Sequence, residues 1–238
     1  MNNFDNFNRE IMLIGQDNFN KLKNSHIIVF GLGGVGGYAV EMIARLGVGK
    51  IDIVDNDTVS NTNLNRQIIA LNSTIGKYKT DLFEERIKEI NKDCIVKKYT
   101  MFYDENTKDK IDFSKYDYVI DAIDSVKSKL NLIIYCINNN INIISSMGMG
   151  NRIDPSLVKI TDISKTEYDP LSKIIRKKLR ENKINHLKVV YSSERPINII
   201  YDINAEKKGS NYAPGSISLV PSTAGIMLAS EVFRDLIK

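Results

Sequence analysis

The first feature suited to chemistry is a glycine-rich turn. Its glycines are Gly31, Gly33, Gly34 and Gly36, in the sequence Gly-Leu-Gly-Gly-Val-Gly. Residues without side chains let backbone N–H groups approach an anion, and a helix that begins at the turn adds a favourable dipole. The turn therefore predicts a site for the phosphates of a nucleotide.

Two carboxylates follow the turn at the end of the next β-rich run, Asp55 and Asp57. A carboxylate about 20 residues after such a turn is placed to accept hydrogen bonds from ribose hydroxyls, and Asp55 has that spacing. For Asp57 two roles are equally open: it orients a neighbouring basic residue, or it caps a turn. Turn and carboxylate together resemble a dinucleotide fingerprint and, taken alone, suggest NAD.

The next segment contains polar and basic residues that a nicotinamide enzyme does not need. They are Asn63, Arg66, Gln67 and Lys79. A dehydrogenase binds its pyrophosphate mostly with backbone groups, whereas nucleotidyl transfer places charge on the α-phosphate and on departing pyrophosphate. Fixed arginine and lysine cations stabilise such charge as it develops. This combination favours ATP over NAD.

A third group of polar residues lies in the sequence Asp-Ala-Ile-Asp-Ser, which begins at Asp121. Asp121 ends a predicted strand, so Asp124 is expected in the loop beyond it, on the ligand side. Carboxylates there can bind Mg²⁺ directly or through water. The alternative role for Asp124 is to cap the helix that follows.

The elements that must position these residues alternate in type. A strand at 25–30, a helix at 38–46 and a strand at 50–54 form a βαβ unit. Further strands are expected at 94–99, 116–121 and 141–145, and helices at 80–90 and 125–138. We predict an α/β fold with a doubly wound, mostly parallel Rossmann-like sheet, whose ligands lie at the carboxyl ends of the strands.

The organisation expected is one domain over residues 1–238, with a nucleotide-binding core at 1–150 and a substrate- and dimer-side extension at 151–238. The extension carries further strands and helices. Its expected elements are strands at 157–163 and 188–191, a basic helix at 170–180, a mobile loop at about 202–216 and a helix capped by Ser222 that runs to about residue 237.

Composition narrows the class of protein. The chain has 238 residues, a formal net charge of +4 and two cysteines, Cys94 and Cys136, which form no CxxC pair. A four-cysteine zinc site is therefore excluded, and buried inert thiols in a reducing compartment are expected. The N-terminus lacks a signal-peptide pattern and no apolar run is long enough to span a bilayer, so a cytoplasmic protein is predicted.

The segment 28–79, with the Asp-Ala-Ile-Asp-Ser loop, resembles the family of ubiquitin-activating-like adenylating enzymes. The resemblance implies an ATP site in which Asp55 binds ribose and Asp124 holds Mg²⁺. The residues that it assigns to the phosphates are Asn63, Arg66 and Lys79. It also implies a homodimer, in which Arg9 reaches the ATP of the partner.

A narrower resemblance, to the tRNA threonylcarbamoyladenosine dehydratases, extends over nearly the whole chain. The segments that carry it are 119–129, 145–155, 161–166, 169–171, 191–196 and 215–222. It implies ATP-dependent adenylation of a carboxylate on the modified nucleoside next to the tRNA anticodon, followed by ring closure with loss of water. Ring closure needs no protein nucleophile, and no cysteine follows Cys136.

Three other functions remain open from the sequence. The first is adenylation of the C-terminus of a ubiquitin-like sulfur-carrier protein, whose activators commonly carry CxxC zinc ligands. The others are an NAD-dependent oxidoreductase and a non-catalytic nucleotide- or tRNA-binding module. The partners expected are a tRNA substrate and a second copy of the chain, with a sulfur-relay protein as a further candidate and no membrane. The basic face of the 170–180 helix, formed by Lys173, Arg176, Lys177 and Arg180, could bind tRNA phosphates, and the alternative is the solvated face of an amphipathic helix.

Overall fold

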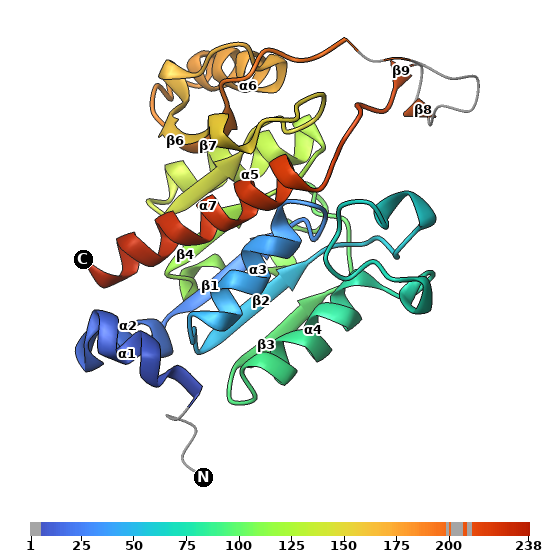
Figure 1. Ribbon diagram of the computed structural model, residues 1–238. Helices are drawn as coiled ribbons and strands as arrows, with labels where there is room; N and C mark the ends of the chain where they lie inside the picture. The colour runs from blue at the N-terminus through green and yellow to red at the C-terminus, as the bar shows by residue number, and fades with distance from the viewer. Residues whose placement is uncertain (1–5, 199, 201–206, 209–210) are drawn as a thin grey trace.

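A seven-stranded sheet forms the centre of the computed structural model, which describes residues 6–198, 200, 207–208 and 211–238 (Figure 1). The strands are β1 His26–Phe30, β2 Lys50–Val54, β3 Ile95–Tyr99, β4 Tyr118–Asp121, β5 Ile143–Ser146, β6 Val158–Asp162 and β7 Lys188–Ser192. Their order is β3-β2-β1-β4-β5-β7-β6, and β6 alone runs antiparallel to its neighbour in this sheet. The predicted doubly wound α/β fold is confirmed.

Helices cover both faces of the sheet. Those on the faces are α3 Gly36–Arg45, α4 Lys79–Ile90, α5 Val126–Asn138, α6 Pro170–Glu181 and α7 Leu219–Ile237. Two further helices, α1 Asn8–Ile14 and α2 Gln16–Asn24, precede β1. The sequence did not predict α1 or α2. The prediction that Ser222 caps the last helix was wrong, because α7 begins at Leu219 and the Ser222 hydroxyl donates to the Leu219 carbonyl within the first turn, at 3.0 Å. Pro221 is tolerated there because the first helical N–H groups need no intrahelical partner.

Two hydrophobic cores lie on opposite faces of the sheet, because successive side chains of a strand point in opposite directions. In β1, Ile27 and Val29 pack into the core shared with α3, α4 and α7, whereas Ile28 and Phe30 pack into the core shared with α5 and α6. All four are fully buried. A strand buried on both faces is a continuous apolar run, which explains why the central strands could be predicted.

The strand order reverses between β1 and β4, and this reversal creates the crevice in which such sheets bind ligands. The chain leaves β1 for α3 on one face and leaves β4 for α5 on the other. The two strand ends remain joined, since the Ala122 amide donates to the Phe30 carbonyl at 2.8 Å. The glycine turn and the loop after β4 therefore lie side by side.

Residues of the extension continue the same sheet. Strand β7 pairs with β5, and α7 lies across α3 on the near face in Figure 1. In the segment predicted as a mobile loop, residues 202–206 and 209–210 lie outside the described residues, while Lys207–Lys208 and Asn211–Tyr212 pair as β8 and β9. In the part of the chain that the structure describes, no helix is long and apolar enough to cross a membrane.

Replacing Gly225 by alanine should destabilise the fold where α7 meets the glycine turn. A Cβ atom at Gly225 would lie 2.2 Å from the carbonyl oxygen of Val35, the residue before α3. Backbone atoms cannot rotate away, so we expect a loss of about 1–3 kcal/mol in the free energy of unfolding, measured by urea titration. Gly215→Ala is the matched control, because its Cβ would meet only the Asn151 side chain at 3.5 Å. Equal midpoints for the two variants would contradict the expectation.

Candidate nucleotide-binding site

The glycine turn is packed so tightly that side chains are excluded at two of its positions. Gly31 has φ +84°, and a Cβ there would lie 2.6 Å from the Ala122 carbonyl oxygen. A Cβ at Gly36 would lie 1.8 Å from the Gly31 oxygen. Gly33 and Gly34 instead approach only the side chains of Gln67 and Arg66 and a carbon of Pro221. These two glycines let a ligand approach the backbone, while Gly31 and Gly36 close the turn itself.

Asp55 joins the end of β2 to the turn. Its two carboxylate oxygens accept hydrogen bonds from the backbone amides of Leu32, at 2.6 Å, and of Asp57, at 2.7 Å. Burial raises the pKa of Asp55, and the opposing charge of Lys79 and the two amides only partly offset that desolvation. The carboxylate is thus fixed beside the turn, where the sequence placed a ribose ligand.

Lys79 is a buried cation, only 4% exposed, at the first residue of α4. A cation at a helix N-terminus is opposed by the helix dipole, so its position requires compensation. The compensation comes from Asp57, whose carboxylate lies 2.8 Å from the ammonium, and from Asp55 at 4.0 Å. Of the two roles open for Asp57, the structure therefore shows the orientation of a basic residue.

The segment after β2 brings Arg66 and Gln67 to the glycine turn, and Asn63 stabilises the start of that segment. Asn63 is buried, and its side-chain oxygen accepts from the Ser60 amide at 3.1 Å. The guanidinium of Arg66 donates to the Thr62 carbonyl at 2.7 Å, and a Cβ built on Gly34 would lie 3.3 Å from the Arg66 Cγ. Arg66 is therefore held over the turn with donors of its planar guanidinium still available.

Gln67 provides an observation that points to a ligand. Its side chain is 6% exposed, and Oε1 has no hydrogen-bond partner among the described residues. A buried polar atom without a partner is costly, so such an atom calls for an explanation. The Nε2 atom of the same amide would lie 3.9 Å from a Cβ on Gly33. A nucleotide on the turn, which brings donors of its own, fits this site.

Asp124 lies in the loop after β4, two residues beyond the Ala122 carbonyl that touches Gly31, and its side chain is exposed. Ser125, not Asp124, occupies the N-cap position of α5, and its side chain makes no capping hydrogen bond. No group of three or more metal-ligating side chains occurs among the described residues. Mg²⁺ in nucleotide sites is commonly held by one or two carboxylates and by substrate phosphates, so a single Asp124 fits that ion.

Asp121, which ends β4, is not available to a ligand. It is fully buried, and its carboxylate accepts from the Lys129 ammonium at 2.7 Å and the Ser145 hydroxyl at 2.5 Å. Lys129 is also fully buried and donates to the Ser146 carbonyl at 2.9 Å. The charge of Asp121 is thus used to join β4, α5 and β5. The sequence signal that was missed is a lysine within an apolar helix.

Arg152 is a second buried residue that the sequence did not single out. Its guanidinium donates to the carbonyls of Gly148, at 2.8 Å, and Gly150, at 3.0 Å, and lies 3.4 Å from the Asp169 carboxylate. Its Nε also donates to the Glu194 carbonyl at 3.2 Å. Arg152 therefore ties the loop after β5 to the segments that precede α6 and follow β7.

Arg9 is the site residue that the fold does not bring to the turn. It is exposed on α1, which packs on α2, and α2 leads directly into the amino end of β1. The turn follows the opposite, carboxyl end of that strand (Figure 1). Arg9 therefore contributes nothing to the nucleotide site of its own chain.

Comparison with known proteins agrees with this geometry. The model of the ThiF family matches residues 7–238. The chain belongs to the ThiF family. The tRNA threonylcarbamoyladenosine dehydratase of Bacillus subtilis is 42% identical over 98% of this chain and 94% of its own length. The Escherichia coli protein of the same name is 41% identical over 71% of this chain and 63% of its length.

Solved structures of ThiF-like fold include that same Escherichia coli dehydratase. Its complex with AMP superposes on this chain with a TM-score of 0.88 at 33% identity, covering 98% of this chain and 94% of the other. Its complex with ATP gives a TM-score of 0.87 at 32% identity over the same shares. The relative that binds adenine nucleotides thus has the same fold over nearly its whole length.

Proposed function

We propose that this ThiF-family chain is an ATP-dependent tRNA threonylcarbamoyladenosine dehydratase. The observation that carries the proposal is the convergence of Arg66, Lys79 and Asp55 on the glycine turn, in a chain 42% identical to the Bacillus subtilis dehydratase over 98% of its length. Residues 1–150 would supply the nucleotide site and residues 151–238 the side that faces tRNA.

Each residue of the site has a role in this proposal. Asp55 binds ribose, and the N–H groups of the turn and Asn63 contact phosphate oxygens. The unpaired Oε1 of Gln67 accepts a hydrogen bond from the nucleotide. Arg66 and Lys79 stabilise the charge that develops when the nucleoside carboxylate attacks the α-phosphate of ATP and pyrophosphate leaves. The activated carboxyl is then attacked by a nitrogen or oxygen of the same nucleoside, and AMP leaves with the carboxylate oxygen.

The finer assignments to Mg²⁺ and to a second copy of the chain are also part of the proposal. Asp124 would hold Mg²⁺, which offsets phosphate charge, so activity should require added Mg²⁺ and fall with Asp124→Asn.

Helix α1 has no buried residue, and Met12 and Leu13 are each 85% exposed. A homodimer would cover this face and direct Arg9 to the partner's nucleotide; sedimentation at micromolar concentration tests it, and a monomer would refute it.

The competing functions lack such support. Cys94 and Cys136 are buried and burial raises the pKa of each thiol to about 12, so neither offers a thiolate for sulfur transfer or a thioester. A sulfur-relay partner and a cytoplasmic location stay predictions from the sequence. In an NAD enzyme, the buried Lys79 and the Arg66 beside the glycine turn would have no catalytic role.

The deciding experiment is an assay on tRNA. The protein is incubated with ATP, Mg²⁺ and tRNA that carries the threonylcarbamoyl modification, and the digested nucleosides are analysed by mass spectrometry. We expect an ATP-dependent nucleoside lighter by one water molecule. A parallel reaction with a sulfur-carrier protein should form no adenylate on its C-terminus. An absence of the dehydrated nucleoside at saturating ATP would refute the proposal.

A further inference from the structure

An arginine and a tyrosine stack on each other at the surface beyond the nucleotide site. The Arg195 guanidinium lies 4.6 Å from the centre of the Tyr168 ring, and it donates to the Tyr168 hydroxyl at 3.4 Å. Both residues are exposed, and Tyr168 is 49% exposed. A half-exposed aromatic ring with an arginine over it is a surface on which nucleobases stack.

The Tyr168 ring is held by a rigid backbone rather than by a loose loop. Tyr168 has φ +55°, in the left-handed region that non-glycine residues rarely adopt. The residue after it, Asp169, caps α6, accepts from the Gly148 amide at 3.2 Å and pairs with buried Arg152. The strained tyrosine is thereby fixed to the loop at the carboxyl end of β5.

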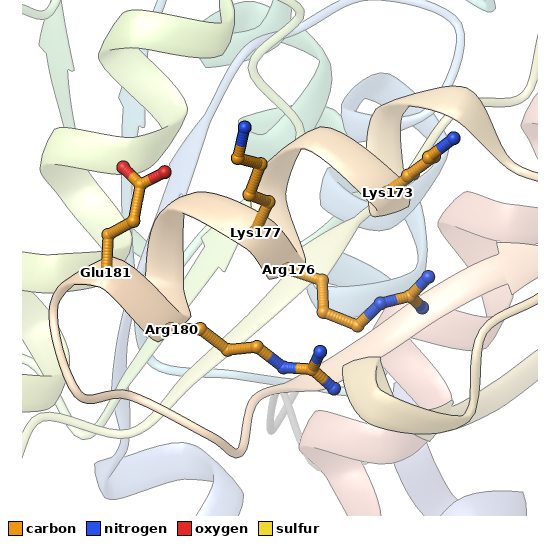
Figure 2. A pocket seen from close by; sticks show the side chains of 5 residues that line it. All are labelled: Lys173, Arg176, Lys177, Arg180 and Glu181. Carbon is orange, nitrogen blue, oxygen red and sulfur yellow. The ribbon is translucent and has the colours of Figure 1, made fainter.

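Helix α6 begins immediately after this stack and presents a row of cations. A depression of about 530 Å³ is lined by Lys173, Arg176, Lys177, Arg180 and Glu181 (Figure 2). The helix is amphipathic, since Ile175 and Leu179 are fully buried against the core below. The expectation that one face of this helix is basic is therefore met.

Not every cation of α6 is available to a ligand. Arg176, which was predicted to bind phosphates, instead donates to the Thr166 carbonyl at 2.9 Å and hydroxyl at 2.7 Å, because it closes the short turn before the helix. Glu181 pairs with Lys178 at 2.8 Å. Within the described part of the chain, no ion pair involves Lys173, Lys177 or Arg180.

We propose that Tyr168 and Arg195 form a stacking platform for an unpaired base of the tRNA anticodon loop, and that Lys173, Lys177 and Arg180 bind the phosphates of the adjoining stem. The inference takes tRNA as the partner from the proposed function. What it adds is the surface of this chain that tRNA contacts. The charge of the row complements an RNA backbone, and the platform lies at the start of α6, where Asp169 contacts the loop after β5.

Two sets of variants test the surface. In the first, Lys173, Lys177 and Arg180 are replaced together by alanine, and the control replaces Lys50, Lys92 and Lys110, which are exposed on other elements. We measure the Kd for tRNA across a range of salt concentrations. The α6 variant should bind tRNA at least ten-fold more weakly at 0.1 M salt, with a log–log salt slope smaller by about 2–3. Equal slopes for the two triple variants would overturn the phosphate surface.

The second set separates the ring from its hydroxyl. Tyr168→Ala should raise the KM for tRNA by roughly 5- to 150-fold with little change in kcat, because one stacked base is lost, whereas Tyr168→Phe should stay near the parent protein. Equal KM values for Tyr168→Ala and Tyr168→Phe would overturn the platform. If the parent protein binds tRNA but forms no dehydrated nucleoside, the proposed function fails, and the Kd of each variant then tests this surface by itself.

Discussion

Arg66→Ala should lower the single-turnover rate of nucleoside dehydration by about 10²–10³, while ATP binding stays within a few-fold of the parent protein. The guanidinium lies over the glycine turn, tied to the Thr62 carbonyl at 2.7 Å and to the Asn65 side chain at 2.9 Å. On the proposed function, it is therefore positioned before the reaction begins and would strengthen its contacts as negative charge accumulates on the phosphates. Quench-flow measurement with saturating tRNA gives the rate, and calorimetry gives the affinity for ATP.

Two further variants make the Arg66 result specific. Arg66→Lys keeps the charge but loses the planar pair of donors, so its rate should lie between those of the parent and the alanine variant. Arg45→Ala is the matched control, because Arg45 is an exposed arginine whose partner is Glu41, four residues away on α3. A parent-like rate for Arg66→Ala, or a loss of rate that follows entirely from a loss of ATP binding, would contradict the assigned role.

Lys129→Met should destabilise the protein by about 3–5 kcal/mol, a large part of the roughly 5–15 kcal/mol that a typical domain has. The substitution leaves the Asp121 carboxylate buried without the ammonium that now lies 2.7 Å away. The Ser145 hydroxyl and the Ile123 amide remain as donors to that carboxylate, but neither carries charge. Urea unfolding followed by circular dichroism measures the change.

A double variant keeps this prediction testable if the single variant does not fold. Lys129→Met combined with Asp121→Asn removes both charges and keeps an acceptor for the Ser145 hydroxyl, so we expect most of the lost stability to return. If the double variant is no more stable than Lys129→Met, the loss comes from packing and not from an unpaired charge.

The sequence predicted the nucleotide-binding half of the fold because that information is local. The runs that became β1 and β2 are mostly apolar and are followed by a glycine and an aspartate, so both the strands and their functional ends could be predicted. The positions of Gly31 and Asp55 follow directly from that pattern. The segment after β2 was predicted only as a set of residue types, and the structure was needed to bring Arg66 and Gln67 onto the turn.

The remaining features depend on contacts between distant residues. The only local trace of the ion pair of Asp121 and Lys129 is a lysine within an apolar helix, which is equally compatible with an exposed edge of that helix. Arg176 follows the same helical spacing as its basic neighbours, yet a turn ten residues earlier in the chain binds it. The start of α7 was misplaced because Pro221 resembles a boundary when the packing against α3 is unknown.

The pairing of Lys79 has a consequence for turnover. Its ammonium is already neutralised by Asp57, so on the proposed function an arriving phosphate replaces one anionic partner by another. The number of ion pairs at this ammonium stays constant, and the released carboxylate, already 59% exposed, returns to water. A lysine that exchanges partners in this way gives a nucleotide less affinity than an unpaired cation would. On the proposed function, this exchange would favour release of the nucleotide product.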